Sequence, residues 1–191
     1  TAFNLIKIFQ SLDYKVTFAP DNLLYVEKYT EDLQRLGVEC LYCSYVTSIQ
    51  SYLEAYGGEY HVVYLARLEY TEKHIDNVRK FAPQAKIIYD TVDLHYLREQ
   101  RKAKLKNSLE LADKATQTKE RELALMTKAD CTLVVSMMEK QMLEKENPHL
   151  QNIEFFNMPR DIYGTNKGFE DRKNILFIGG FQHPPLSLIH I

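Results

Sequence analysis

The densest group of chemically competent side chains in the sequence lies within twelve residues near its middle. This group comprises two carboxylates, one histidine and two guanidinium groups: Asp90, Asp93, His95, Arg98 and Arg101. Carboxylates accept hydrogen bonds from sugar hydroxyls, histidine and arginine donate them, and arginine is suited to bidentate contact with phosphate. The group therefore predicts a site for a hydroxyl-rich or phosphorylated ligand. The alternative is that Asp93 caps the following helix and that the arginines are solvated.

Hydrophobic periodicity and turn signals predict that strands and helices alternate around this group. The predicted strands are 15–19, 38–42, 60–65, 86–89, 131–135 and 153–156, and the predicted helices are 2–9, 26–36, 47–57, 70–81, 96–128 and one that begins at Ser136. Capping boxes are predicted at Thr47 with Gln50 and at Ser136 with Glu139. Such alternation is typical of an α/β, Rossmann-like parallel sheet with helices on both faces. Strand 60–65 is almost continuously apolar, which predicts burial on both faces.

Ligands of open α/β sheets bind beyond the carboxyl ends of the strands. The Asp90–Arg101 group follows strand 86–89 directly, so it is expected at this edge of the sheet. Arg67 follows strand 60–65 and is expected to face the same crevice as Asp93 and His95. Taken alone, Arg67 would be equally compatible with a surface position.

The composition changes near the C-terminal end of the sequence. We expect three parts: an N-terminal domain over 1–157, a linker over 158–172 that contains Pro159, Gly164 and Gly168, and the start of a second α/β domain over 173–191. The second domain would open with a strand that ends in Gly179 and Gly180. A glycine pair at a strand end lets a phosphate approach the backbone closely, although it also suits a bare tight turn.

Several classes of protein are disfavoured by the remaining composition. The net charge of −2 gives no overall attraction to nucleic acid, and no apolar run is long enough to span a bilayer. The three cysteines favour a reducing compartment, and the Cys40–Cys43 pair lacks the further ligands of a zinc site. The scattered histidines predict no metal site, and no serine hydrolase motif is present. We expect a cytoplasmic protein.

A run of basic residues follows Asp93 and His95 in the sequence. Arg98, Arg101, Lys102, Lys104 and Lys106 are balanced only by a single glutamate in the same run. The stretch fits peripheral contact with an anionic membrane surface or with a phosphorylated acceptor, and it also fits a solvated helix face. The tyrosines are not interleaved with these basic residues, so we expect no nucleic acid partner.

Three stretches resemble bacterial glycosyltransferases of the group 1 type, also called family 4. They are YDTVDLHYLREQR at 89–101, ADCTLVVS at 129–136 followed by Glu139, and NILFIGGFQHPP at 174–185. The resemblance implies a glycosyltransferase B-type fold, in which two Rossmann-like domains face each other. It also implies that the N-terminal domain binds the acceptor and that the C-terminal domain binds a nucleotide-sugar, with no metal or other cofactor.

This resemblance implies a function in polysaccharide or glycoconjugate assembly. A sugar would pass from a nucleotide-sugar donor to a glycan or glycoconjugate acceptor with retention of configuration. The expected site residues are catalytic His95 and Asp93, acceptor-binding Arg67, Asp90, Arg98 and Arg101, and donor-binding Gly179 and Gly180. A first strand is expected to be missing before Thr1, and the tail from Leu186 departs from the family. The chain is therefore expected to be an inactive fragment. Peripheral contact of the protein with the inner membrane face stays open.

Two other functions remain compatible with the sequence. One is a non-catalytic binding module, such as a flavodoxin-like or response-regulator-like domain, although neither the phosphate loop nor the acidic pair of those domains is seen. The other is a nucleotide-sugar epimerase of similar two-domain shape. The long helix expected after Asp93 and His95 favours the transferase.

Overall fold

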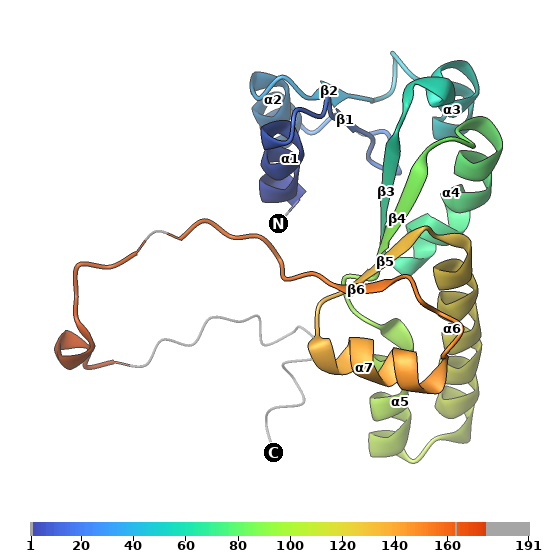
Figure 1. The fold of residues 1–191 in the computed structure, drawn as a ribbon, viewed down its shortest axis with the longest axis vertical. Coiled ribbons are helices and arrows are strands. Elements are labelled where there is room, and N and C mark those ends of the chain that lie inside the picture. Colours follow the sequence, from blue (N-terminus) through green and yellow to red (C-terminus); the bar gives the residue numbers. More distant parts are fainter. Residues whose placement is uncertain (1, 163, 175–191) are drawn as a thin grey trace. The chain divides into compact units, whose positions relative to one another are not determined.

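The computed structural model describes residues 2–162 and 164–174, and helices alternate with strands along most of this length (Figure 1). The α-helices are α1 (Ala2–Ser11), α2 (Glu27–Arg35), α3 (Ile49–Tyr56), α4 (Leu68–Phe81), α5 (His95–Lys106), α6 (Leu109–Lys128) and α7 (Met137–Glu146). The strands are β1 (Thr17–Phe18), β2 (Glu39–Cys40), β3 (Val62–Ala66), β4 (Lys86–Asp90), β5 (Cys131–Val134) and β6 (Ile153–Phe155), and two short 3-10 helices are η1 (Gly57–Glu59) and η2 (Phe169–Asp171). The six strands predicted before residue 157 are confirmed.

All strand pairings are parallel, as the alternation of strands and helices predicts. Four strands form one sheet in the order β3-β4-β5-β6, and β1 pairs with β2 in a second, two-stranded sheet. Right-handed crossovers between sequential neighbours put α4, α6 and α7 on one face of the larger sheet. Phe9 of α1 packs against Tyr64 of β3 with ring centroids 6.2 Å apart, whereas the flanking Val63 and Leu65 face the core under α4. Helices therefore lie on both faces of this α/β sheet.

The main core lies between the four-stranded sheet and the helices α4 and α6. Its fully buried members include Ile75, Ile87, Tyr89 and Met126. The prediction that strand 60–65 is buried on both faces is wrong, because every residue of β3 is only partly buried. The physical reason is its position: β3 is the edge strand of the larger sheet, so one of its flanks has no hydrogen-bonded neighbour among residues 2–162 and 164–174.

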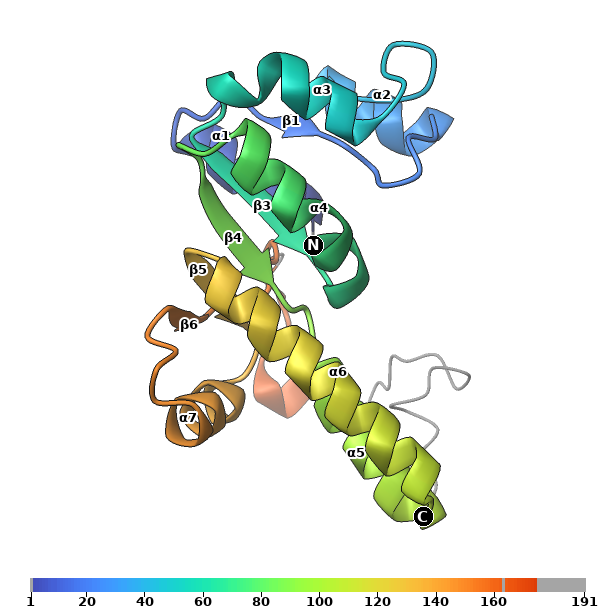
Figure 2. The same cartoon turned by 90° about the vertical axis from the view of Figure 1, so that its right-hand side faces the viewer.

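The predicted helix over 96–128 is two helices that form a hairpin. Asn107 takes a left-handed conformation (φ 46°) and ends α5, and the Ser108 hydroxyl caps α6 by accepting the Leu111 N–H at 3.3 Å. Twenty residues make α6 about 30 Å long, whereas the five residues of β4 span about 17 Å. The hairpin therefore extends well past the carboxyl edge of the sheet (Figure 2).

The two predicted capping boxes are not formed. Ser48, and not Thr47, is the N-cap of α3, and its hydroxyl accepts the Ser51 N–H at 3.0 Å. Ser48 has the extended backbone that an N-cap requires, so the N-cap lies one residue later than predicted. Ser136 is the N-cap of α7 but makes no side-chain capping hydrogen bond.

The chain divides into two compact units, Thr1–Pro159 and Arg160–Ile191. The predicted linker over 158–172 lies across this division, and η2 is the one regular element within 158–162 and 164–172. The predicted strand after Asn174, the donor-binding Gly179 and Gly180, and the tail from Leu186 lie outside the described residues.

Candidate functional site

The carboxyl end of β4 carries a tight turn that starts the candidate site. Asp90 Oδ1 accepts the backbone N–H of Val92 at 2.9 Å, and Asp90 Oδ2 accepts the hydroxyl of Tyr64 on β3. Val92 has a positive φ of 62°, which is strained for a β-branched residue. Both carboxylate oxygens of Asp90 are thus engaged within the protein, where they shape the turn that leads to Asp93.

Asp93, His95 and Arg98 come together directly after this turn. The His95 Nε2 atom lies 3.5 Å from Asp93 Oδ1, and Arg98 Nη1 donates a hydrogen bond to Asp93 Oδ2. The His95 side chain is only 10% exposed, whereas Asp93 and Arg98 are partly open to solvent. The sequence predicted these three residues as one group, and the structure brings them into direct contact.

The electrostatics of this group favour a charged pair. The hydrogen bond between the two side chains raises the pKa of His95, although burial opposes the shift, and Asp93's negative charge adds to it. The same hydrogen bond lowers the pKa of Asp93 against the effect of burial, and the charge of Arg98 reinforces the shift. A protonated imidazole places a positive charge beside the Asp93 carboxylate, and this carboxylate can accept a hydrogen bond from a ligand hydroxyl.

The carboxyl end of β3 contributes two further charged residues to the same edge. Arg67, at the start of α4, donates its backbone N–H to the Asp90 carbonyl at 2.9 Å, and its positive charge helps to lower the pKa of Asp93. Arg67 also has a positive φ of 73°. Glu69 Oε1 lies 3.5 Å from His95 Nδ1. Arg67 was predicted from sequence, whereas Glu69 was not, because an acidic residue in the first turn of a helix is common.

A buried carboxylate holds the start of α5, and sequence reasoning missed it. Glu122 of α6 is fully buried, its Oε1 accepts the His95 N–H at 3.0 Å, and its Oε2 accepts the Tyr96 N–H at 3.0 Å. Burial raises the pKa of Glu122, and the two backbone hydrogen bonds oppose that shift. One sequence signal could have revealed it, since Glu122 falls on the helical stripe formed by Ala115, Thr118, Leu125 and Met126.

The first turn of α7 brings a further carboxylate toward the group. Glu139 is half-buried, and its Oε2 atom is buried without a hydrogen-bond partner among the described residues. Burial raises the pKa of Glu139, the charge of Asp93 raises it further, and the charge of Arg101 opposes both effects. Arg101 itself is exposed. Buried acceptors are normally hydrogen-bonded, so an unpartnered one near Asp93 suits a hydroxyl-bearing ligand.

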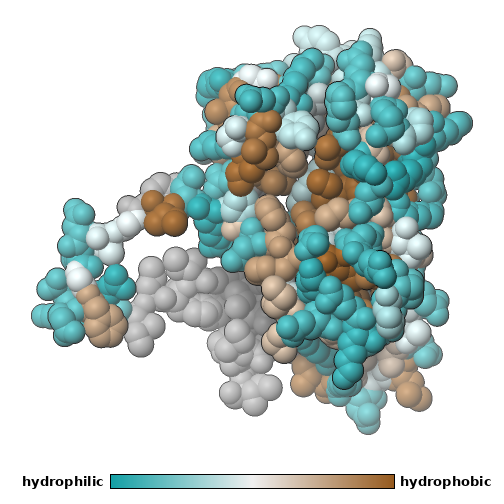
Figure 3. All heavy atoms as spheres, in the orientation of Figure 1, coloured by the Kyte–Doolittle hydropathy of each residue, from teal (hydrophilic) through white to brown (hydrophobic). Residues whose placement is uncertain are grey.

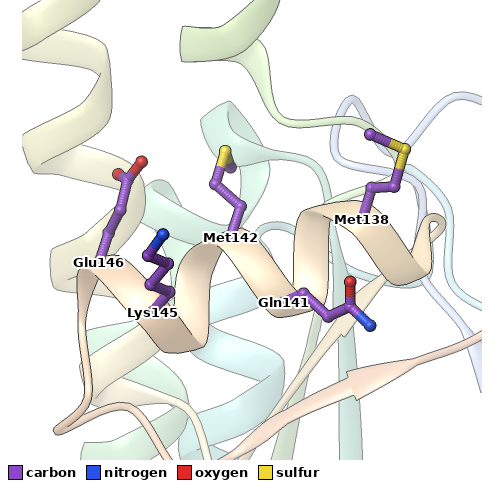
Figure 4. Close-up of a pocket in the computed structure, with 5 residues that line it drawn as sticks. All are labelled: Met138, Gln141, Met142, Lys145 and Glu146. Carbon is purple, nitrogen blue, oxygen red and sulfur yellow. The ribbon is translucent and has the colours of Figure 1, made fainter.

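A shallow hollow on α7 is a separate feature. Its lining residues are Met138, Gln141, Met142, Lys145 and Glu146, and Met138, Met142 and Glu146 project from the same side of the helix (Figure 4). None of the predicted site residues that the structure describes lines it. Because one helix supplies every lining side chain, the hollow does not join groups from different strand ends, and we place the candidate site at Asp93 and His95 instead.

No cluster of three or more histidine, cysteine, aspartate or glutamate side chains in residues 2–162 and 164–174 is arranged to hold a metal ion. No helix in the same ranges is both long enough and apolar enough to cross a bilayer.

Comparisons of the chain with protein-family models, with curated proteins and with solved structures gave no match.

Proposed function

We propose that this chain is the acceptor-side part of a retaining glycosyltransferase that uses a nucleotide-sugar as donor. The observation that carries the proposal is the contact between His95 and Asp93 at the carboxyl end of β4, with His95 Nε2 3.5 Å from Asp93 Oδ1. Ligands of parallel α/β sheets bind at this edge. The resemblance at 89–101 supports the same assignment, because it covers both residues.

The chemistry of the group suits an acceptor sugar. In the proposed reaction the bond between the donor's anomeric carbon and its diphosphate breaks, and a bond from the acceptor hydroxyl oxygen to that carbon forms on the same face. The acceptor proton passes to the departing diphosphate. Asp93 accepts a hydrogen bond from an acceptor hydroxyl and orients it, and protonated His95, whose ring nitrogens face Asp93 and Glu69, supplies positive charge beside that hydroxyl.

The proposal is tested with the natural gene that encodes this sequence, expressed with whatever coding sequence flanks it. Purified protein is offered a panel of nucleotide-sugars, and release of the nucleotide is followed with and without glycan acceptors. We expect one donor to be used, and we expect His95→Ala to lower kcat by about a hundredfold or more. His149→Ala, an exposed histidine beyond α7, is the matched control and should leave kcat unchanged.

Two results would count against the proposal. Absence of donor hydrolysis or transfer across the panel would remove the glycosyltransferase assignment and favour a binding module. Full activity in His95→Ala would leave the fold intact but would show that the group at β4 is not the site.

A further inference from the structure

The α5–α6 hairpin ends in a turn that carries two exposed leucines. Leu105, in the last turn of α5, is 57% exposed, and Leu109, the first residue of α6, is 85% exposed. The hairpin extends past the carboxyl edge of the sheet, so its turn lies away from the core (Figure 2). Hydrophobic atoms lie on either side of hydrophilic ones at the lower margin of Figure 3, where the hairpin ends in Figure 1.

Basic residues outnumber acidic ones around this turn: Lys104 and Lys106 flank Leu105, and Glu110 follows Leu109. Residues 98–114 contain six lysines or arginines and three acidic residues, in a chain whose net charge is −2. Arg98 pairs with Asp93, and Lys114 pairs with Glu99. Four basic side chains remain: Arg101, Lys102, Lys104 and Lys106. Within the part of the chain that the structure describes, none of the four forms an ion pair. All four are exposed, so their charges are free to attract an anionic surface.

We propose that the turn of this hairpin docks on an anionic membrane surface, with Leu105 and Leu109 entering the interface between head groups and acyl chains. Exposed leucines on a turn with an excess of basic residues match this surface in both apolar character and charge. A single-stranded nucleic acid fits less well, because residues 98–114 contain no aromatic side chain on which a base could stack. This inference stands on the hairpin alone and does not rest on the proposed glycosyltransferase function.

Vesicle co-sedimentation of the 191-residue chain tests the inference. One set of vesicles contains phosphatidylcholine alone, and the other contains about a third phosphatidylglycerol to give an anionic surface. We expect binding to the anionic vesicles only, and we expect it to weaken as salt shortens the Debye length. The double variant Lys104→Glu with Lys106→Glu should lower the partition coefficient at least about tenfold.

A second double variant separates insertion from simple charge attraction. Leu105→Ser with Leu109→Ser keeps the net charge and should still lower the partition coefficient by roughly tenfold, because the apolar contact is lost. The matched controls are Lys15→Glu with Lys28→Glu, which change the net charge equally at exposed sites, and Leu12→Ser with Leu24→Ser, which remove similarly exposed leucines. Both controls should bind as the parent chain does.

Four outcomes would overturn the inference. The first is no binding of the chain to either kind of vesicle, and the second is binding that the hairpin variants leave unchanged. The third is binding that the matched controls lower as much as the hairpin variants do. The fourth is a dimer, seen by sedimentation velocity, that the leucine variant dissociates while the chain binds no vesicle. The last result would identify a second copy of this chain as the occupant. Circular dichroism melting of each variant checks folding, and all substituted side chains are exposed, so melting temperatures should stay close to that of the parent.

Discussion

The carboxylate of Glu122 accepts the backbone N–H of His95 at 3.0 Å, so a residue of α6 caps the start of α5. The residue at the N-cap position, Leu94, has no side chain that could do this, and it makes no side-chain capping hydrogen bond. The same carboxylate also accepts the Tyr96 N–H. The position of His95 relative to Asp93 therefore depends on packing between two helices as well as on the local turn.

Removing this carboxylate should destabilise the fold strongly. Glu122→Ala leaves two buried N–H groups without acceptors, and we expect the free energy of unfolding to fall by about 3 kcal/mol. Urea unfolding followed by circular dichroism measures the change. Glu120→Ala, an exposed glutamate on the same helix, is the control and should change the free energy by no more than about 0.5 kcal/mol. Equal effects of the two substitutions would contradict the capping role.

The charged pair of His95 and Asp93 should make stability depend on pH. The raised pKa of His95 means that its contribution is fully present below the ordinary histidine pKa of about 6.5 and is lost as the pH rises through the raised value. The lowered pKa of Asp93 means that its contribution is present above about pH 3.9 and is lost as the pH falls through the lowered value. The pair should therefore stabilise the fold most between about pH 4 and 6.5.

Replacing Asp93 tests whether its carboxylate raises the pKa of His95. Asp93→Asn should lower the pKa of His95, because the hydrogen bond to the carboxylate is the largest cause of its elevation. Titration of the histidine ring signals by NMR measures the shift directly, and Asp113→Asn, an exposed site on α6, should leave the signals of His95 where they are. A His95 pKa that does not move in Asp93→Asn would show that the two side chains are not coupled.

Gly57 should tolerate no side chain, because the backbone of the end of α4 passes very close to it. A Cβ atom at Gly57 would lie only 2.4 Å from the Phe81 carbonyl oxygen, whereas a Cβ atom at Gly58 would meet nothing within 4 Å. We expect Gly57→Ala to lower the free energy of unfolding by roughly 2 kcal/mol. Thermal melting of Gly57→Ala and Gly58→Ala compares the two, and a larger loss in Gly58→Ala would contradict the observed packing.

Local patterns predicted the order of the elements because those patterns depend on residues that are neighbours in the sequence. The apolar runs that became β4 and β5, and the charged group that begins at Asp90, could be read directly. The break between α5 and α6 could not, because the apolar spacing continues across it. Asn107 ends α5 and Ser108 caps α6, so these two residues form the break. Both residue types are also tolerated inside helices, so whether they end a helix depends on the packing of the hairpin.

By itself, the sequence determined that this is an α/β protein and that Asp93, His95 and Arg98 follow the end of one strand. The tertiary structure alone decided that Glu69 reaches His95, that Glu122 caps α5 and that the acceptor oxygen of Glu139 is buried near the same group. The physical reason is that these contacts join residues far apart in the sequence. The burial of Glu122 is favourable only because two backbone N–H groups of α5 satisfy its carboxylate, and only the folded chain brings those groups to it.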